Sequence, residues 1–246
     1  MAPITMQGRA MQLKEYTHDE YPHRVPIYHK QREAIAAYWG QPLTPLYSEQ
    51  GFGVCDIPRP LYTRLKNAFR FEWHVWPDDF VAERTTVNAY QTETALWNIA
   101  WDSVPLAMRW KQPLARQDSP ALLMRNDAVF ETSLHDPNII DLHQQFSGCT
   151  LVPETMYGPR IYQHGSLLAC HTDRDNLIIS STLLIDYELD VPWPLVLFFP
   201  NRIVEIYMEA GEMLFYEGNV IPHARPTPMR GTYFANVYYH YRPIAT

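Results

Sequence analysis

Short apolar runs separated by turn residues fill the last third of the chain, and they constrain its fold more than any other feature. They are RIYQHGSLLACHTD, LIISSTLLIDYEL, PLVLFF, RIVEIYM, EMLFYEG and TYFANVYYHY, all after Tyr157. Runs of this length that are rich in Ile, Val, Tyr and Phe are typical of β-strands. We therefore predict about six mainly antiparallel strands in this region, arranged as a sandwich or jelly roll.

Helical patterns are confined to the part of the chain before residue 151. Leu61, Leu65 and Phe69 recur at helical spacing after a proline, a residue favoured at helix starts. The other helical patterns are each followed by a glycine, which commonly ends a helix. We predict helices over 27–39, 60–73 and 138–146, a strand within 51–58, and strands with long loops over 76–137, where Trp97, Trp101 and Trp110 are most simply core residues.

These patterns predict a single domain over residues 1–246. Residues 1–26 are polar and interrupted by prolines, so we expect an arm or loop that lies over the domain. Residues 27–150 form a helical and mixed part, and residues 151–246 form the jelly-roll segment. No repeat and no Gly/Ser-rich linker divides the chain. The predicted fold class is α+β, with a mainly β core on which the N-terminal helices pack.

Charge and composition exclude several kinds of partner. The formal net charge of −7 provides no basic field for nucleic acid. No apolar stretch approaches the roughly 20 residues of a membrane helix, and the N-terminus lacks the apolar core of a secretory signal. Cys55, Cys149 and Cys170 form no CxxC pair, which argues against a disulfide framework and a thiolate zinc site. We expect a cytoplasmic protein without nucleic-acid or membrane partners; the sequence does not indicate its oligomeric state.

One group of residues suggests a metal site. His171 and Asp173 are separated by one residue on a predicted strand, so their side chains should share a face. His223 lies 52 residues after His171, just beyond another predicted strand, and can supply a third ligand. Two imidazoles and one carboxylate on one side of a metal form the facial triad of non-haem Fe(II) oxygenases, which leaves coordination positions open.

An isolated HxD pair has little specificity. A similar HxE string, His18-Asp19-Glu20, occurs in a segment without strand character. A structural role is expected for His164, because the neighbouring Gly165 suggests a turn. Surface or hydrogen-bonded roles are the simpler expectation for the remaining histidines, which are His23, His29, His74, His135, His143 and His240.

The wider sequence context strengthens the metal-site interpretation. The segments YGPRIYQHGSLLACHTDR, STLLIDYELDVPWPLVLF and AGEMLFYEGNVIPHARPTPMRGTYFANVYYHYRP resemble the Fe(II)/2-oxoglutarate-dependent dioxygenases, most closely the prolyl hydroxylase-like branch. The resemblance covers about the last third of the chain and implies a double-stranded β-helix, a distorted jelly roll whose interior holds iron. It also implies that Tyr162, nine positions before His171, hydrogen-bonds the oxoglutarate. The alternative for Tyr162 is an ordinary core tyrosine.

The chain departs from the family pattern at the oxoglutarate anchor. The family usually has Lys or Arg ten positions after the distal histidine, where this chain has Tyr233. A dianionic ligand in a barrel interior still requires a cation. Arg225 is the leading substitute, because on a strand it would share the inward face of His223. Arg230 and Arg160 are the alternatives, and a solvent-facing role remains open for all three.

The resemblance implies an enzyme that uses Fe(II), 2-oxoglutarate and O2 to hydroxylate an unactivated C–H bond, with release of succinate and CO2. Asp173 favours hydroxylation, because related halogenases replace this carboxylate with a small residue to admit chloride. The implied substrate is an amino-acid-like small molecule or a residue in a peptide. Two other readings stay open: a catalytically silent jelly-roll module that binds a ligand or protein, and a cupin-like zinc or iron hydrolase.

Overall fold

The computed structural model describes residues 12–26, 28, 32–39, 47–69, 80–83, 121–124 and 128–244. From residue 151 onward it contains eight strands, two more than predicted. A turn at His164 and Gly165 divides one predicted run into two strands, and one strand has only three residues, too few to leave a sequence pattern. The strands are β5 (Leu151–Gln163), β6 (Leu168–His171), β7 (Ile179–Leu189), β8 (Leu195–Phe198), β9 (Ile203–Tyr207), β10 (Glu212–Glu217), β11 (His223–Arg225) and β12 (Gly231–Pro243).

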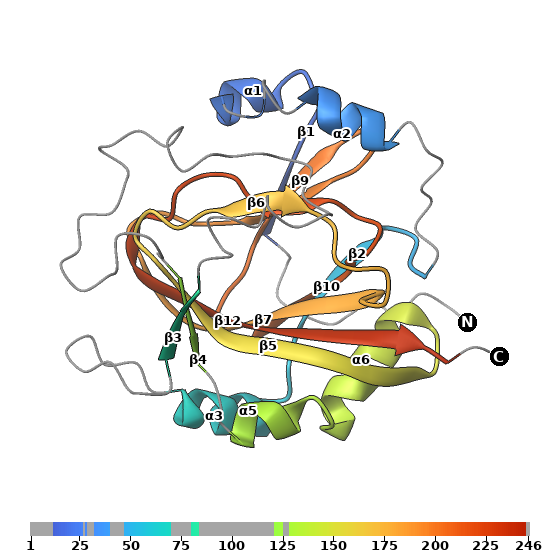
Figure 1. Ribbon diagram of the computed structural model, residues 1–246, viewed down its shortest axis with the longest axis vertical. Coiled ribbons are helices and arrows are strands. Elements are labelled where there is room, and N and C mark those ends of the chain that lie inside the picture. The colour runs from blue at the N-terminus through green and yellow to red at the C-terminus, as the bar shows by residue number, and fades with distance from the viewer. Residues whose placement is uncertain are drawn as a thin grey trace.

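These strands form two facing antiparallel sheets (Figure 1). One sheet has the order β1-β9-β8-β11-β6, and the other has the order β2-β10-β7-β12-β5-β4-β3. Strands β5, β7, β10 and β12 belong to the second sheet and β6, β8, β9 and β11 to the first, so the chain crosses repeatedly between them. This topology confirms the predicted jelly roll of the double-stranded β-helix type. The added strands are β1 (Gln12–Tyr16), β2 (Phe52–Asp56), β3 (Phe80–Glu83) and β4 (Ala121–Met124).

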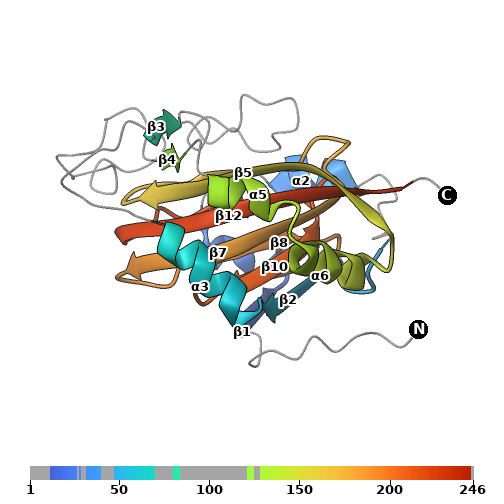
Figure 2. The ribbon, with the colours of Figure 1, turned by 90° about the horizontal axis from the view of Figure 1, so that it is seen from below.

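Helices cover the outer faces of both sheets. Helices α3 (Arg59–Ala68), α5 (Ala128–Ser133) and α6 (Pro137–Ser147) lie across the seven-stranded sheet (Figure 2). Helices α1 (Tyr21–Arg24) and α2 (Arg32–Trp39) lie on the opposite side of the molecule, over the five-stranded sheet. Because the helices lie on the outer faces, the space between the two sheets is occupied by the side chains that point inward from the strands.

Side-chain alternation along β12 separates the core from this interior. One apolar cluster, here named the helix-side cluster, includes residues of α3, α5 and α6. The β12 residues that pack in it are Ala235, Val237, Tyr239 and Tyr241. The intervening side chains, from Phe234 to His240, therefore face the other sheet, because successive residues of a strand point to opposite faces. The same rule places Ser180 and Thr182 of β7 inside, between outward residues of the helix-side cluster.

The predicted helices are present where the structure describes them. Helix α6 matches the 138–146 prediction, with Asp136 as N-cap and Gly148 as a left-handed C-cap at φ 69°. Helix α3 begins one residue before the predicted start and ends at Ala68, and residues 70–73 lie outside the described residues. Helix α2 forms the second half of the 27–39 prediction. Helix α5 was not predicted.

The N-terminal segment is more ordered than the expected arm. Residues 12–16 form β1, which pairs with β9 along its whole length, and α1 follows. The hydrogen bonds of this edge strand come from β9, so the sequence of residues 12–16 carries little trace of them. Trp97, Trp101 and Trp110 lie outside the described residues. No helix in the described ranges is long and apolar enough to cross a membrane.

Candidate metal centre

His171 and Asp173 reach the same point by different means. Strand β6 ends at His171, so the expectation that Asp173 lies on a strand is wrong. The backbone N–H of Asp173 instead donates to the Gly218 carbonyl at 2.7 Å, in the loop after β10. This bond holds the chain beyond β6 against the loop that leads to β11. The side chains of His171 and Asp173 therefore converge because of this tertiary contact, and not because both lie on one strand.

His223 is brought to His171 by strand pairing. It is the first residue of β11, and it lies directly opposite His171 in the antiparallel ladder between β11 and β6. The two ring centroids are 4.3 Å apart. The two histidines are far apart in sequence, and the pairing of the three-residue strand β11 with β6 brings their imidazole rings together.

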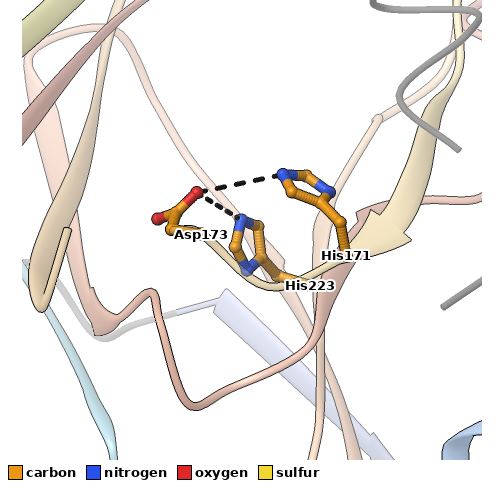
Figure 3. Close-up of side chains that lie close together, drawn as sticks. All are labelled: His171, Asp173 and His223. Carbon is orange, nitrogen blue, oxygen red and sulfur yellow. Dashed lines mark ion pairs between the residues drawn. The ribbon is translucent and has the colours of Figure 1, made fainter. Parts of the chain in front are cut away.

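The three side chains could hold one metal ion. Their ligand atoms all lie within 4.8 Å of one another. The Asp173 Oδ1 atom is 3.9 Å from His171 Nε2 and 3.7 Å from His223 Nε2 (Figure 3). Two imidazole nitrogens and one carboxylate oxygen suit a divalent first-row metal and leave the remaining side of the ion open. His171 is also the more exposed of the two histidines, with 17% of its side chain accessible against 3% for His223.

The protonation states fit metal binding. His223 Nδ1 lies 2.9 Å from the Ile221 carbonyl, which can only accept, so Nδ1 carries a proton and Nε2 is the ring nitrogen aimed at the carboxylate and available to a metal ion. Burial acts to raise the pKa of Asp173, but the nearby histidines, His223 first, and a serine hydroxyl together lower it. The carboxylate is therefore ionised, as a ligand must be.

Arg225 is a buried cation close to this centre. Its side chain is fully enclosed, and Nη1 donates to the Trp193 carbonyl at 2.6 Å. The guanidinium carbon lies 4.7 Å from the Trp193 ring centroid and 4.5 Å from that of Phe234. Its Nε has no hydrogen-bond partner, and no carboxylate in the described part of the chain pairs with it. Aromatic faces offset part of its desolvation, but a buried charge without a counter-ion remains costly.

Two tyrosines lie beside this cation. The hydroxyls of Tyr162 and Tyr238 are 2.8 Å apart, and Tyr238 also hydrogen-bonds Arg225. Tyr162 is fully buried, with its ring edge-on to Trp193 at 5.0 Å. Burial raises the pKa of Tyr162, so its phenol stays protonated and can donate a hydrogen bond. The structure thus brings Tyr162 and Arg225 together.

The other anchor positions are arranged differently. Tyr233 packs in the helix-side cluster and donates to Asp186 at 2.7 Å, so it is on the wrong face of β12 to reach the interior. Arg230 is exposed, and Arg160 is half-buried with its guanidinium carbon 5.1 Å from the Tyr238 ring centroid. Of the three arginines considered, the one on β11 is fully buried between the sheets.

Sequence reasoning missed three residues around Asp173. Ser180 donates to the Asp173 carboxylate, and His240 hydrogen-bonds Ser180. His240 thus has the hydrogen-bonded role that was expected, but its partner touches a candidate ligand. Gly218 is the third, because its backbone lies directly against Asp173. Alternation along β7 and β12 would have placed Ser180 and His240 inside, but only the paired register shows that they meet.

No protein-family model and no curated protein matches the sequence. Solved structures do match. AviO1 from Streptomyces viridochromogenes Tue57 is 13% identical with a TM-score of 0.50, over 88% of this chain and 96% of that one. An oxidoreductase of the 2OG-Fe(II) oxygenase family from Burkholderia pseudomallei is 14% identical with a TM-score of 0.44, over 84% and 89%. A Pseudomonas putida prolyl-4-hydroxylase is 13% identical with a TM-score of 0.46, over 86% and 100%.

The similarity to AviO1 shows the fold. This similarity agrees with the strand order of the two sheets, and that order is established by the structure without any comparison. At these identities the comparisons assign no activity, so the function has to be argued from the site itself.

Proposed function

We propose that this protein is an Fe(II)/2-oxoglutarate-dependent dioxygenase that hydroxylates an unactivated C–H bond. The observation that carries the proposal is a metal-ligand triad and an uncompensated buried cation in one β-sandwich interior. A metal-binding triad alone would suit a hydrolase as well. The additional cation accounts for a second requirement of this reaction, the binding of a dicarboxylate cosubstrate.

His171, Asp173 and His223 would hold Fe(II). The donor set of two imidazoles and one ionised carboxylate fits this ion, and ligands on one side leave the other side for cosubstrate. When bound, Fe(II) supplies dioxygen activation coupled to decarboxylation of 2-oxoglutarate to succinate and CO2. The protein contributes the orientation of the ligands and an enclosed site.

Arg225 would pair with the distal carboxylate of 2-oxoglutarate. Its Nε is a buried donor without a partner, and an incoming carboxylate would satisfy that donor and neutralise the charge. Tyr162 and Tyr238 can add a phenol hydrogen bond to the same anion, since their paired hydroxyls lie next to the guanidinium. The arginine of β11 thus performs the task that the family usually gives to a basic residue on the last strand.

The substrate proposed is an amino-acid-like small molecule or a residue in a peptide, as the sequence resemblance implies. We also propose a cytoplasmic location. All three cysteines are free, which is typical of a reducing compartment.

Anaerobic addition of Fe(II) and 2-oxoglutarate tests the proposal. The expected result is a weak visible metal-to-ligand charge-transfer band, followed by succinate when air is admitted. Asp173→Ala should lose both signals through loss of the metal. A wild-type protein that binds metal but gives no band would contradict the proposal and favour a silent binding module.

Arg225→Met tests the anchor. Loss of one partner of a buried charge pair costs about 2–5 kcal/mol, so the oxoglutarate Kd should rise by at least about 30-fold. Arg230→Met is the matched control, because it removes the same charge from an exposed position and should leave the Kd unchanged. An unchanged Kd in Arg225→Met would move the anchor to Arg160.

A further inference from the structure

The two oxygens of Asp173 face different partners. Oδ1 points to the two imidazoles, whereas Oδ2 accepts a hydrogen bond from Ser180 Oγ at 2.7 Å. Ser180 is fully buried on β7, so water does not compete for this bond. One carboxylate oxygen is therefore committed to the protein, and one is left for a metal ion.

His240 fixes the direction of the Ser180 hydroxyl. Its Nδ1 is 2.9 Å from Ser180 Oγ. A serine hydroxyl has one proton, and its acceptor-only neighbours are the ionised Asp173 carboxylate at 2.7 Å and the Leu177 carbonyl at 3.3 Å, so that proton is directed at the nearer and charged Asp173. His240 Nδ1 must then carry a proton and donate to Ser180. The His240 ring is buried and held edge-on against Tyr157, with centroids 5.5 Å apart.

Gly218 supplies the space for this arrangement. A Cβ atom added at Gly218 would overlap both Asp173 Oδ2 and Ser180 Oγ. Its φ is outside the left-handed range, so the glycine is not required by backbone conformation. Its missing side chain is required because the carboxylate and the hydroxyl occupy that volume. Gly218 and Ser180 together enclose Oδ2.

We propose that Ser180 and His240 are positioning residues that restrict Asp173 to a single metal-ligating oxygen. The inference rests on the proposed function, because limiting Asp173 to one ligating oxygen matters only for an octahedral metal ion that must also bind a chelating cosubstrate. Binding through both carboxylate oxygens would occupy one more position on the ion. With the cosubstrate chelated, no position would then remain for a further ligand.

Counting the exchangeable waters on Mn(II) tests this directly. Mn(II) is added to the purified protein, and the relaxation of water protons reports how many waters the bound ion retains. Ser180→Ala should retain metal binding but show one fewer exchangeable water than the wild type, with and without 2-oxoglutarate. Ser181→Ala is the matched control, since it removes a hydroxyl from the adjacent residue of β7, whose side chain faces the helices. It should keep the wild-type number.

A pair of His240 variants separates positioning from packing. His240→Asn can place an amide N–H near the Nδ1 position and should keep the wild-type water count, whereas His240→Phe keeps a ring without a donor and should lose one water. Equal water counts in the wild type, Ser180→Ala and His240→Phe would overturn the inference and leave the proposed function standing. If the wild type binds no Mn(II), both fall. Should Ser180→Ala not fold, the His240 pair decides.

Discussion

Protonation of His143 should destabilise the protein as the pH falls below neutrality. His143 lies on α6, fully buried against the outer face of the seven-stranded sheet. Nδ1 is 2.7 Å from the Ile139 carbonyl, and Nε2 is 2.8 Å from Ser181 Oγ. Burial lowers the pKa of His143 from 6.5 to about 3. In the unfolded chain the ring is solvated and keeps its ordinary pKa.

The sign and size of the effect follow from linkage. Because the folded pKa is below the unfolded one, the unfolded state binds the proton first. The stability associated with His143 is therefore fully present above pH 6.5 and is lost progressively as the pH falls towards 3. Each pH unit in this window is worth up to about 1.4 kcal/mol. Integration from pH 7 to pH 5 gives a loss of about 2 kcal/mol from this single residue.

Urea unfolding of the wild type and His143→Gln at pH 7 and pH 5 measures the loss. Both proteins are kept metal-free with a chelator, so that metal release does not contribute. The wild type should lose about 2 kcal/mol more than His143→Gln between the two pH values. His135→Gln, at an exposed position, should follow the wild type. Parallel losses in the wild type and His143→Gln would refute the reasoning.

Three further changes test the site. Gly218→Ala should weaken Mn(II) binding by about tenfold or more, because the added methyl overlaps the Asp173 carboxylate; calorimetry showing wild-type affinity would contradict this. Tyr38→Phe removes a 2.8 Å hydrogen bond to the Val220 carbonyl, in the loop before the distal histidine, and should weaken Mn(II) binding about 3- to 10-fold; an unchanged Kd would show that α2 does not support this loop. Tyr233→Phe should leave the oxoglutarate Kd unchanged, since its hydroxyl lies on the helix side; a large rise in Kd would place it in the cosubstrate site.

The sequence determined most strands of the C-terminal sandwich and the helices α3 and α6, because their signals are local. Short apolar runs rich in Ile, Val, Tyr and Phe, with turn residues between them, predicted the jelly roll that the strand order confirms. The HxD spacing identified His171 and Asp173, and the two-residue spacing from His223 identified Arg225, which does lie buried on the same short strand. The inference for Arg225 needs only the period of a strand, whereas Asp173 converges with His171 although it lies beyond the end of β6.

The tertiary structure decided which of these side chains meet. Asp173 lies beyond its strand, and its carboxylate is oriented by Ser180 on β7 and by Gly218, which is distant in sequence. Tyr233 occupies the family's anchor position but faces the helices, because the strand register assigns it to that side. Local periodicity fixes which residues share a face of one strand. Only the pairing of strands across the sandwich fixes which faces, and therefore which charges and ligands, lie within bonding distance.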